Sequence, residues 1–521
     1  MNPVKRWRAV LAVSAVALVL SACGGGDDDG GGGAASGDPV EGGSLSLIQM
    51  SEPRILDPAT MTNGFSTNGP AGNALFGQLL ADKADGSFDY VLAKSLESDD
   101  GGATWVLTLR DGLTFSDGSP MDAEDVAFNW KRTQDPEIGS TSKTLADYID
   151  KFDPKGQVLT FTLTQPIANY GYAITGGTMN WIAKPEALEA GQAAFDKNPI
   201  GAGPFVMESW TRGGKMVLKK NAKYFDKGKP YLDELVLTAN GDEGQRFSTV
   251  ESGGADATMS SSAAYLERGK DNGLDVVTQG LNGGIGMALN NRFAPFDDPK
   301  AREAVAKAVD LEAVNDAAYD GAGEVPRTLF TKKSPLYTDV PFTSYDKAGA
   351  QKLFDELADE GKPVKFTITA YQTSESRRVG EAFQAQLSAY KNVKADLEVL
   401  DFPAATAKTN NREFQMSPVG GVSFSDPELG VYQAYYSSSV GNVTGVKDDQ
   451  LDAALDKGRQ STDVDERKAA YKVVAERLAE LNPFILYTRT VGALAHTKDV
   501  AGFELYGQGT PRVDGAWTTK Q

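Results

Sequence analysis

The run TWVLTLRDGLTFSDGSPMDAEDVAFNWKR, residues 104–132, indicates the fold class of this chain more clearly than any other stretch. Its first six residues place a large apolar side chain at every second position, which is the pattern of a strand with one buried face. Two Asp-Gly turns follow the strand. Asp122 then stands as an N-cap with Asp125 three residues later, a capping-box arrangement that predicts a helix from about residue 123.

The predicted helix has one apolar face. Val126, Ala127 and Trp130 recur at helical spacing and should be buried, whereas Lys131 and Arg132 are expected to stay in water. Further helices are expected at about 346–358, 376–390, 448–460 and 464–481, with a strand at 365–370 between the first two. This alternation of strands and helices predicts an α/β fold.

Length and charge limit the possible functions. The chain is 40% hydrophobic and 24% charged, which is an ordinary composition for a globular protein. Its 521 residues are too many for one compact core. Two or more domains are therefore expected. The formal net charge of −19 should repel nucleic acids and anionic lipid surfaces, so no nucleic-acid partner is expected.

The chain contains one cysteine and one histidine. These counts exclude a Cys-based zinc site, an internal disulfide and a site with several His ligands, so neither a resident metal nor a cofactor is expected. His496 is the single available imidazole base and is expected to be a structural residue near a strand end, with ligation of a carried metal as the alternative. No nucleophile elbow or phosphate-binding loop occurs. A carboxylate-pair hydrolase of glycans or peptides stays open as a second hypothesis.

The N-terminus has the pattern of an export signal. Basic residues within 5–8 precede an apolar stretch at 9–20 that is too short to span a bilayer comfortably. Leu20-Ser21-Ala22-Cys23 resembles the lipobox of bacterial lipoproteins, so residues 1–22 are predicted to be removed and Cys23 to be lipidated. Residues 23–43, rich in Gly and Asp, are predicted to be a flexible tether. The mature protein is thus expected outside the cytoplasm, anchored to the membrane by lipid.

Several segments resemble one known family in the same order. The opening run, preceded by SDDG at 98–101, resembles the signature of extracellular solute-binding proteins of family 5, the peptide/nickel-binding type that serves ABC importers. LDP at 56–58, GAGPF at 201–205 and the run at 287–310 from Met-Ala-Leu-Asn to Ala-Val-Asp also resemble that family. The resemblance covers about residues 44–515, nearly the whole mature chain.

The resemblance implies a bilobed, periplasmic-binding-protein-like α/β fold of type II, in its large three-domain variant, with a hinged cleft. The implied limits are 44–82, 200–288 and 489–521 for domain I, 83–199 for domain II and 289–488 for domain III. The implied function is capture of a small solute, an oligopeptide or peptide-like compound, by a monomer that delivers it to an ABC permease. A metal chelate or another non-peptide solute is the alternative.

The segment GGVSFSDP, residues 420–427, is the most informative candidate for ligand binding. Peptide-binding members of the family carry, four residues before the Pro, an Asp that pairs with the peptide α-ammonium, and here that position is Ser423. A serine accepts a hydrogen bond but cannot neutralise a buried charge, so simple peptides are less favoured. Phe424 is expected in the pocket, and Asp426 either replaces the missing carboxylate or serves as a turn residue.

Two loops and one aromatic residue are further candidates. Met61 and Asn63 lie where the family lines the cleft from domain I, and Ser142 lies where domain II contributes. Trp181 is a candidate pocket wall, although a buried core position is favoured for a tryptophan.

Overall fold

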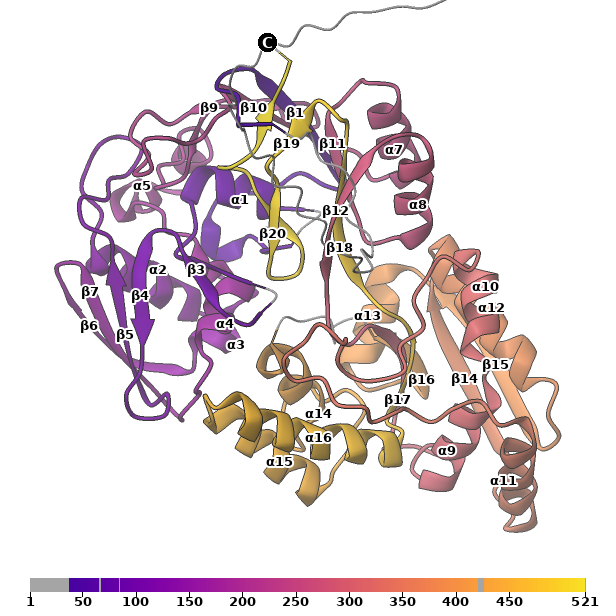
Figure 1. The fold of residues 1–521 in the computed structure, drawn as a ribbon. Coiled ribbons are helices and arrows are strands. Elements are labelled where there is room, and N and C mark those ends of the chain that lie inside the picture. Colours follow the sequence, from indigo (N-terminus) through magenta and orange to yellow (C-terminus); the bar gives the residue numbers. More distant parts are fainter. Residues whose placement is uncertain (1–36, 65–66, 84, 420–425, 521) are drawn as a thin grey trace, which may run out of the picture.

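The computed structural model describes residues 37–64, 67–83, 85–419 and 426–520. Its larger sheets contain seven, four and five strands, and helices pack around each of them (Figure 1). We call the parts of the molecule built on these sheets unit I, unit II and unit III, respectively. The mixture of sheets and helices confirms the α/β class predicted from the sequence.

Unit I takes its strands from distant parts of the chain, in the order β12-β18-β11-β1-β10-β9-β8. β1 runs parallel to both neighbours, pairing Ser44 with Glu234 in β10 and Leu47 with Ala257 in β11. The strands are β1 (Ser44–Gln49), β8 (Phe205–Trp210), β9 (Met216–Lys220), β10 (Glu234–Ala239), β11 (Ala257–Ser260), β12 (Asp275–Gly280) and β18 (Val491–His496). The helices around it are α1 (Gly69–Phe76), α5 (Pro185–Glu189), α6 (Gln192–Phe195), α7 (Glu243–Glu251) and α8 (Ala263–Asp271).

Unit II is an antiparallel sheet in the order β4-β5-β7-β6. The strand predicted at the start of the opening run is β5, and its burial alternates as expected, with Trp105, Leu107 and Leu109 on the core side. The strands are β4 (Ala93–Glu97), β5 (Thr104–Leu109), β6 (Ile149–Lys155) and β7 (Val158–Leu163), with α2 (Ala123–Gln134), α3 (Lys143–Ala146) and α4 (Gly171–Gly176) beside them. The hairpin of β2 (Leu80–Asp82) and β3 (Phe88–Tyr90) adjoins this unit.

The predicted capping box is present at the start of α2. The Asp122 carboxylate accepts a hydrogen bond from the backbone N–H of Glu124 at 2.9 Å, and Asp125 accepts one from the backbone N–H of Asp122 at 2.9 Å. These bonds satisfy donors that the first turn of a helix leaves free, which is why the helix begins where the sequence predicted.

The apolar face of α2 packs into the core of unit II. Trp130 is fully buried, its ring meets Phe161 edge-on at 5.3 Å between centroids, and its indole N–H donates to the Met179 carbonyl at 2.8 Å. The expectation that Arg132 stays in water is wrong, because its guanidinium forms a partly buried ion pair with Asp57. This pair ties the end of α2 to the turn that the LDP segment makes.

Unit III has the strand order β15-β14-β16-β13-β17. β14 and β15 run parallel and are joined by α12, so the predicted alternation is a β-α-β unit. The strands are β13 (Ile285–Leu289), β14 (Val364–Tyr371), β15 (Val393–Leu400), β16 (Met416–Val419) and β17 (Phe484–Thr488). The helices are α9 (Pro299–Ala308), α10 (Leu311–Tyr319), α11 (Lys347–Asp359), α12 (Ser374–Leu387), α13 (Phe402–Asn410), α14 (Gln433–Tyr435), α15 (Asp449–Gln460) and α16 (Val464–Leu481). The four helices predicted beyond residue 345 are thus confirmed as α11, α12, α15 and α16.

Two short crossovers connect units I and III. One joins β12 to β13 through residues 281–284, and the other joins β17 to β18 through residues 489–490. In Figure 1, β12 and β18 run side by side from the seven-stranded sheet toward the five-stranded sheet. Any rotation between these units must therefore bend these two segments.

The expected domain limits stay predictions, and the packing suggests where to adjust them. Leu79 and Leu80, expected in domain I, lie in the core of unit II, whereas Leu188 and Phe195, expected in domain II, lie in the core of unit I. β13, which the expected limit at 288 would cut, belongs wholly to the five-stranded sheet. We therefore propose that domain II ends near Ile182, the last core residue of unit II before Ala183 joins unit I.

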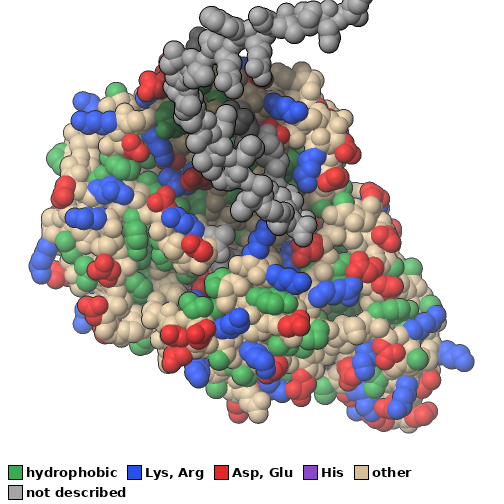
Figure 2. All heavy atoms as spheres, viewed as in Figure 1, with side chains coloured by type: hydrophobic (Ala, Val, Ile, Leu, Met, Phe, Trp, Pro, Cys, Tyr) green, Lys and Arg blue, Asp and Glu red, His purple; other side chains and the backbone are tan. Residues whose placement is uncertain are grey.

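One face of the molecule is polar and mixed in charge (Figure 2). On the face shown in Figure 2, acidic and basic side chains are interspersed and hydrophobic side chains are scattered among them. Single exposed hydrophobic side chains of this kind are normal on a solvated surface. Within the described ranges, no helix combines the length and the apolar character needed to cross a membrane.

Candidate ligand-binding cavity

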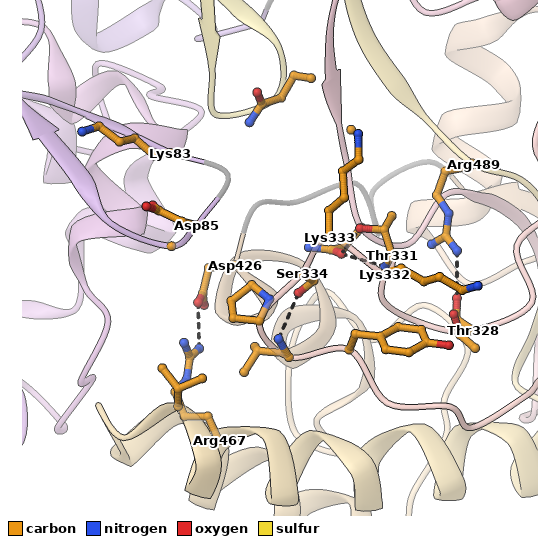
Figure 3. A pocket seen from close by; sticks show the side chains of 18 of the residues that line it. Lys83, Asp85, Thr328, Thr331, Lys332, Lys333, Ser334, Asp426, Arg467 and Arg489 are labelled. Carbon is orange, nitrogen blue, oxygen red and sulfur yellow. Dashed lines mark hydrogen bonds and ion pairs between the residues drawn. The ribbon is translucent and has the colours of Figure 1, made fainter. Parts of the chain in front are cut away.

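A cavity of about 900 Å³ lies where the three units face one another. This volume is near the upper end of the range of about 300–1,000 Å³ that small-ligand sites occupy. Each unit contributes part of the wall. The lining includes Thr278 from unit I, Asn282 from the crossover at 281–284, Lys83, Asp85 and Tyr172 from unit II, and Thr328, Thr331, Lys332, Lys333, Ser334, Asp426 and Arg467 from unit III. In Figure 3, Lys83 and Asp85 stand across the cavity from Thr331 to Ser334.

Much of the unit III wall is one long irregular segment, residues 320–346, which contains neither helix nor strand. The segment is held down by three apolar side chains buried in the unit III core, which are Leu329, Phe330 and Leu336. The backbone N–H of Thr331 also donates to the Asn282 side chain at 3.1 Å. The wall is therefore anchored although it is irregular.

Arg489 fastens the same segment to both crossovers. Its guanidinium donates to the carbonyls of Gly283 at 2.8 Å, Thr328 at 3.1 Å and Leu329 at 3.2 Å, and Figure 3 shows the Thr328 contact. Burial lowers the pKa of Arg489, but a guanidinium stays charged in proteins. The cavity wall and the crossover segments are consequently coupled through one side chain.

A buried ion pair forms the floor of the cavity. Asp426, 2% exposed, accepts a hydrogen bond from Arg467 at 2.7 Å and another from the backbone N–H of Glu428 at 3.0 Å (Figure 3). Because the Arg467 guanidinium already matches its charge, Asp426 has little left to offer a ligand ammonium. The idea that Asp426 replaces the carboxylate missing at Ser423 stays a prediction, but this geometry weighs against it.

Units II and III touch beside this floor, around Arg459 at the end of α15. Its guanidinium donates to both Glu428 carboxylate oxygens, with Nε 2.9 Å from each. It also donates to the Tyr148 hydroxyl of unit II at 3.2 Å. The same guanidinium lies over the Tyr432 ring at 3.3 Å from its centroid. The backbone N–H of Ala168 in unit II donates to the Arg459 carbonyl at 3.0 Å. These contacts make Arg459 a bridge between the two units.

The unit II wall combines an aromatic side chain with a charged loop. The Tyr172 hydroxyl donates to the Gly86 carbonyl at 2.7 Å, and its burial raises the pKa of Tyr172, so this donor stays protonated. Hydrogen bonds from the Ser87 hydroxyl and backbone N–H lower the pKa of Asp85. Asp85 is therefore ionised at neutral pH.

The charged lining residues are more often basic than acidic. The basic ones are Lys83, Arg327, Lys332, Lys333, Arg467 and Arg489. The acidic ones are Asp85, Glu324, Asp339 and Asp426. The cavity therefore differs in sign from the chain as a whole, whose formal net charge is −19.

His496 lies away from this cavity, at the end of β18. It is 1% exposed, and its Nδ1 is 2.9 Å from the Thr497 carbonyl oxygen. In the part of the chain that the structure describes, no group of three or more His, Cys, Asp or Glu side chains is placed to hold a metal ion.

The structure distributes the predicted site residues unevenly. Asp426 lines the cavity, whereas Ser423, Phe424 and Cys23 fall outside the described residues. Met61, Asn63, Ser142 and Trp181 are at most 7% exposed and are not among the lining residues. Their role in binding stays a prediction.

Three of these buried residues make specific structural contacts. The Trp181 indole N–H donates to Asn73 Oδ1 at 2.9 Å, the Asn63 amide donates to the Thr175 carbonyl at 2.8 Å, and Ser142 Oγ accepts from the backbone N–H of Thr178 at 2.9 Å. These bonds join units I and II or stabilise unit II, so each side chain has a role that needs no ligand.

Sequence reasoning missed most of the lining, above all residues 324–339 and Arg467. One signal was present, because a structureless stretch longer than about 12–15 residues in a compact domain is usually functional. Nothing in the sequence marks Arg467, which looks like any basic residue on the surface of a helix.

The sequence matches the family model described as bacterial extracellular solute-binding proteins, family 5 Middle. The match covers residues 88–442, which is more than half of the chain. This protein belongs to that family. The oligopeptide-binding protein AppA of Bacillus subtilis (strain 168) is 24% identical over 94% of this chain and 94% of its own length. The resemblance found in the opening run is confirmed.

Solved structures of other proteins share the fold of this family 5 member. The structure of AppA from Bacillus subtilis in complex with a nonapeptide has a TM-score of 0.76 and 22% identity, covering 93% of this chain and 100% of that one. AgaA in complex with agropinic acid, from A. tumefacien R10, has a TM-score of 0.76 and 25% identity, covering 92% and 99%. The predicted bilobed, periplasmic-binding-protein-like fold is confirmed.

Proposed function

We propose that this family 5 protein captures an oligopeptide or a peptide-like solute in the 900 Å³ cavity and delivers it to the permease of an ABC importer. The observation that carries the proposal is that all three units contribute polar walls to this one space. Two relatives support it, since AppA was solved with a nonapeptide and AgaA with agropinic acid. No catalytic role is proposed.

Capture depends on two arrangements of the units. A ligand that touches the walls of units II and III at once binds better when those walls are close together, so its binding energy favours the closed arrangement. The crossovers at 281–284 and 489–490 are the segments that would bend. A permease that recognises the closed arrangement then receives the loaded protein and not the empty one.

Two measurements test this function. Native mass spectrometry of protein purified from its own host should show a retained peptide or peptide-like mass, and calorimetric titration with that compound should show one saturable site. A retained metal chelate or other non-peptide compound would instead support the alternative ligand class. Turnover of peptides or glycans that is lost on replacing one carboxylate would support the exported hydrolase.

Replacing Ser423 with aspartate is expected to raise the affinity for the neutral tripeptide Ala-Ala-Ala by about tenfold, because a carboxylate neutralises a desolvated ammonium and a hydroxyl does not. Calorimetry measures the effect. N-acetyl-Ala-Ala-Ala, which lacks the ammonium, is the matched ligand and should gain nothing. Equal gains for both peptides would show that Ser423 does not face the ammonium.

Replacing Cys23 with alanine is expected to move nearly all of the protein from the membrane fraction to the supernatant. Each buried CH₂ of an acyl chain contributes about 0.8 kcal/mol to membrane binding, so loss of the anchor removes the main attraction of a chain with net negative charge. Immunoblotting of fractionated cells measures the distribution. Ser36→Ala in the tether is the control and should stay with the membrane, and retention of the Cys23 variant would rule out the anchor.

A further inference from the structure

Half of the charged residues that line the cavity form ion pairs within the protein. Arg467 pairs with Asp426, and Arg489 approaches Glu324 with 3.5 Å between Nε and Oε1. Arg327 pairs with Glu312, which lies outside the cavity lining. None of these arginines therefore adds a full free positive charge to the cavity.

Lys332 and Lys333 differ from these three arginines. Neither ammonium has an ion-pair partner or a hydrogen-bond partner among the residues that the structure describes, and both are exposed to the cavity space. Lys83 lies near enough to Asp85 to help lower the pKa of that carboxyl. Asp339 receives a hydrogen bond from the Tyr337 hydroxyl at 3.3 Å. Lys332 and Lys333 are thus two adjacent positive charges in the lining that have no acidic partner among the described residues.

The backbone that carries these lysines is fixed. The Ser334 N–H donates to the Thr331 carbonyl at 3.0 Å, the Tyr337 N–H donates to the Ser334 carbonyl at 3.0 Å, and the Leu336 N–H donates to the Ser334 hydroxyl at 3.2 Å. Asn282 holds the Thr331 N–H on the other side. Within this segment the two side chains can adjust to a ligand while the backbone keeps its conformation, which lowers the entropy that binding costs.

We propose, on the basis of the proposed function, that Lys332 and Lys333 select a solute of net negative charge whose anionic groups contact their ammonium groups. Closing the cavity removes water from these ammonium groups, and a charge that loses its water without a partner is strongly unfavourable. An acidic ligand supplies the partner. A neutral or basic peptide leaves both lysines uncompensated, so the protein discriminates against it.

The test uses three probes and the intact protein without its signal segment. The tripeptides Ala-Glu-Glu and Ala-Gln-Gln have nearly the same shape but differ in charge, and citrate is an anion that is not a peptide. We expect Ala-Glu-Glu to bind at least tenfold more tightly than Ala-Gln-Gln. Lys332→Ala and Lys333→Ala should each reduce the affinity for Ala-Glu-Glu by about tenfold, and leave Ala-Gln-Gln within about twofold.

Lys352→Ala is the matched control, since Lys352 is a lysine of unit III whose side chain is 78% exposed and lies outside the cavity lining. It should change no affinity. The preference for Ala-Glu-Glu should also shrink as the salt concentration rises, because salt screens the charges in the open arrangement. Thermal melting of each variant checks that the fold is intact.

The outcomes separate this inference from the proposed function. Equal binding of the two tripeptides, unaffected by the lysine variants, would overturn the charge preference and leave peptide capture standing. Binding of citrate alone, weakened in the Lys332 and Lys333 variants, would support the charge preference and overturn peptide capture. Failure of all three probes to bind at millimolar concentration would overturn both.

Discussion

Replacing Arg467 with alanine is expected to lower the free energy of unfolding by about 3–5 kcal/mol, because it leaves the Asp426 carboxylate buried without a counter-charge. The two side chains are only 7% and 3% exposed, and 2.7 Å separates their charged atoms. Ligand binding should fall with stability, since the same pair forms the floor of the cavity. Urea unfolding followed by circular dichroism measures the first effect and calorimetry the second.

Two further variants identify the cause of this loss. Arg467→Met combined with Asp426→Asn removes both charges, so it should recover a large part of the lost stability, since an Asn oxygen can still accept from the Glu428 N–H. Lys472→Ala on the same helix breaks only an exposed pair with Glu476 and should cost less than about 0.5 kcal/mol. A loss below about 1 kcal/mol for Arg467→Ala would show that water or other groups compensate Asp426.

Replacing Trp130 with alanine is expected to destabilise unit II by about 3–5 kcal/mol. The substitution leaves a cavity against Phe161 and deprives the Met179 carbonyl of its donor. Trp130→Phe keeps part of the apolar volume but not the donor, so it should cost an intermediate amount. In differential scanning calorimetry of the alanine variant, the unfolding transition of unit II should move to a lower temperature.

Lys131→Ala, one residue further along α2, is the control for Trp130. Its ammonium lies 5.5 Å from the centroid of the Phe152 ring on an exposed face, where such contacts contribute about 0.5–1 kcal/mol. A cost for Trp130→Ala no larger than that of the control would mean that the core of unit II repacks around the missing indole.

The fold was predictable where local sequence and burial agree. The alternation in β5 and the Asp122–Asp125 capping box depend on neighbouring residues, so they could be read directly from the sequence. The domain limits were harder, because helix α6 follows unit II in the chain but packs Phe195 into the core of unit I. Only the tertiary packing decides which core a short helix joins.

The binding cavity was far less predictable. The partners in its floor, Asp426 and Arg467, are 41 residues apart, and neither position has a local pattern that implies the other. Trp181 shows the same difficulty from the other side, because an aromatic side chain that could form a pocket wall is buried, as the favoured expectation held, and bonds to Asn73. Long-range pairing of polar side chains leaves no periodic signal in the sequence, unlike helices and strands.

The position of β1 at the middle of the seven-stranded sheet has a consequence for the order of folding. Its neighbours in β10 and β11 follow it by 190 and 210 residues, and the next strand, β18, lies close to the C-terminus. Because synthesis starts at the N-terminus, the core of unit II can form long before all strands of the unit I sheet have been made. Joining such distant segments is slow, and unpaired strand edges attract other chains. Unit I therefore contains the first strand to be made and yet is the last unit to fold. Its sheet is completed only when β18, within the final thirty or so residues, has been made.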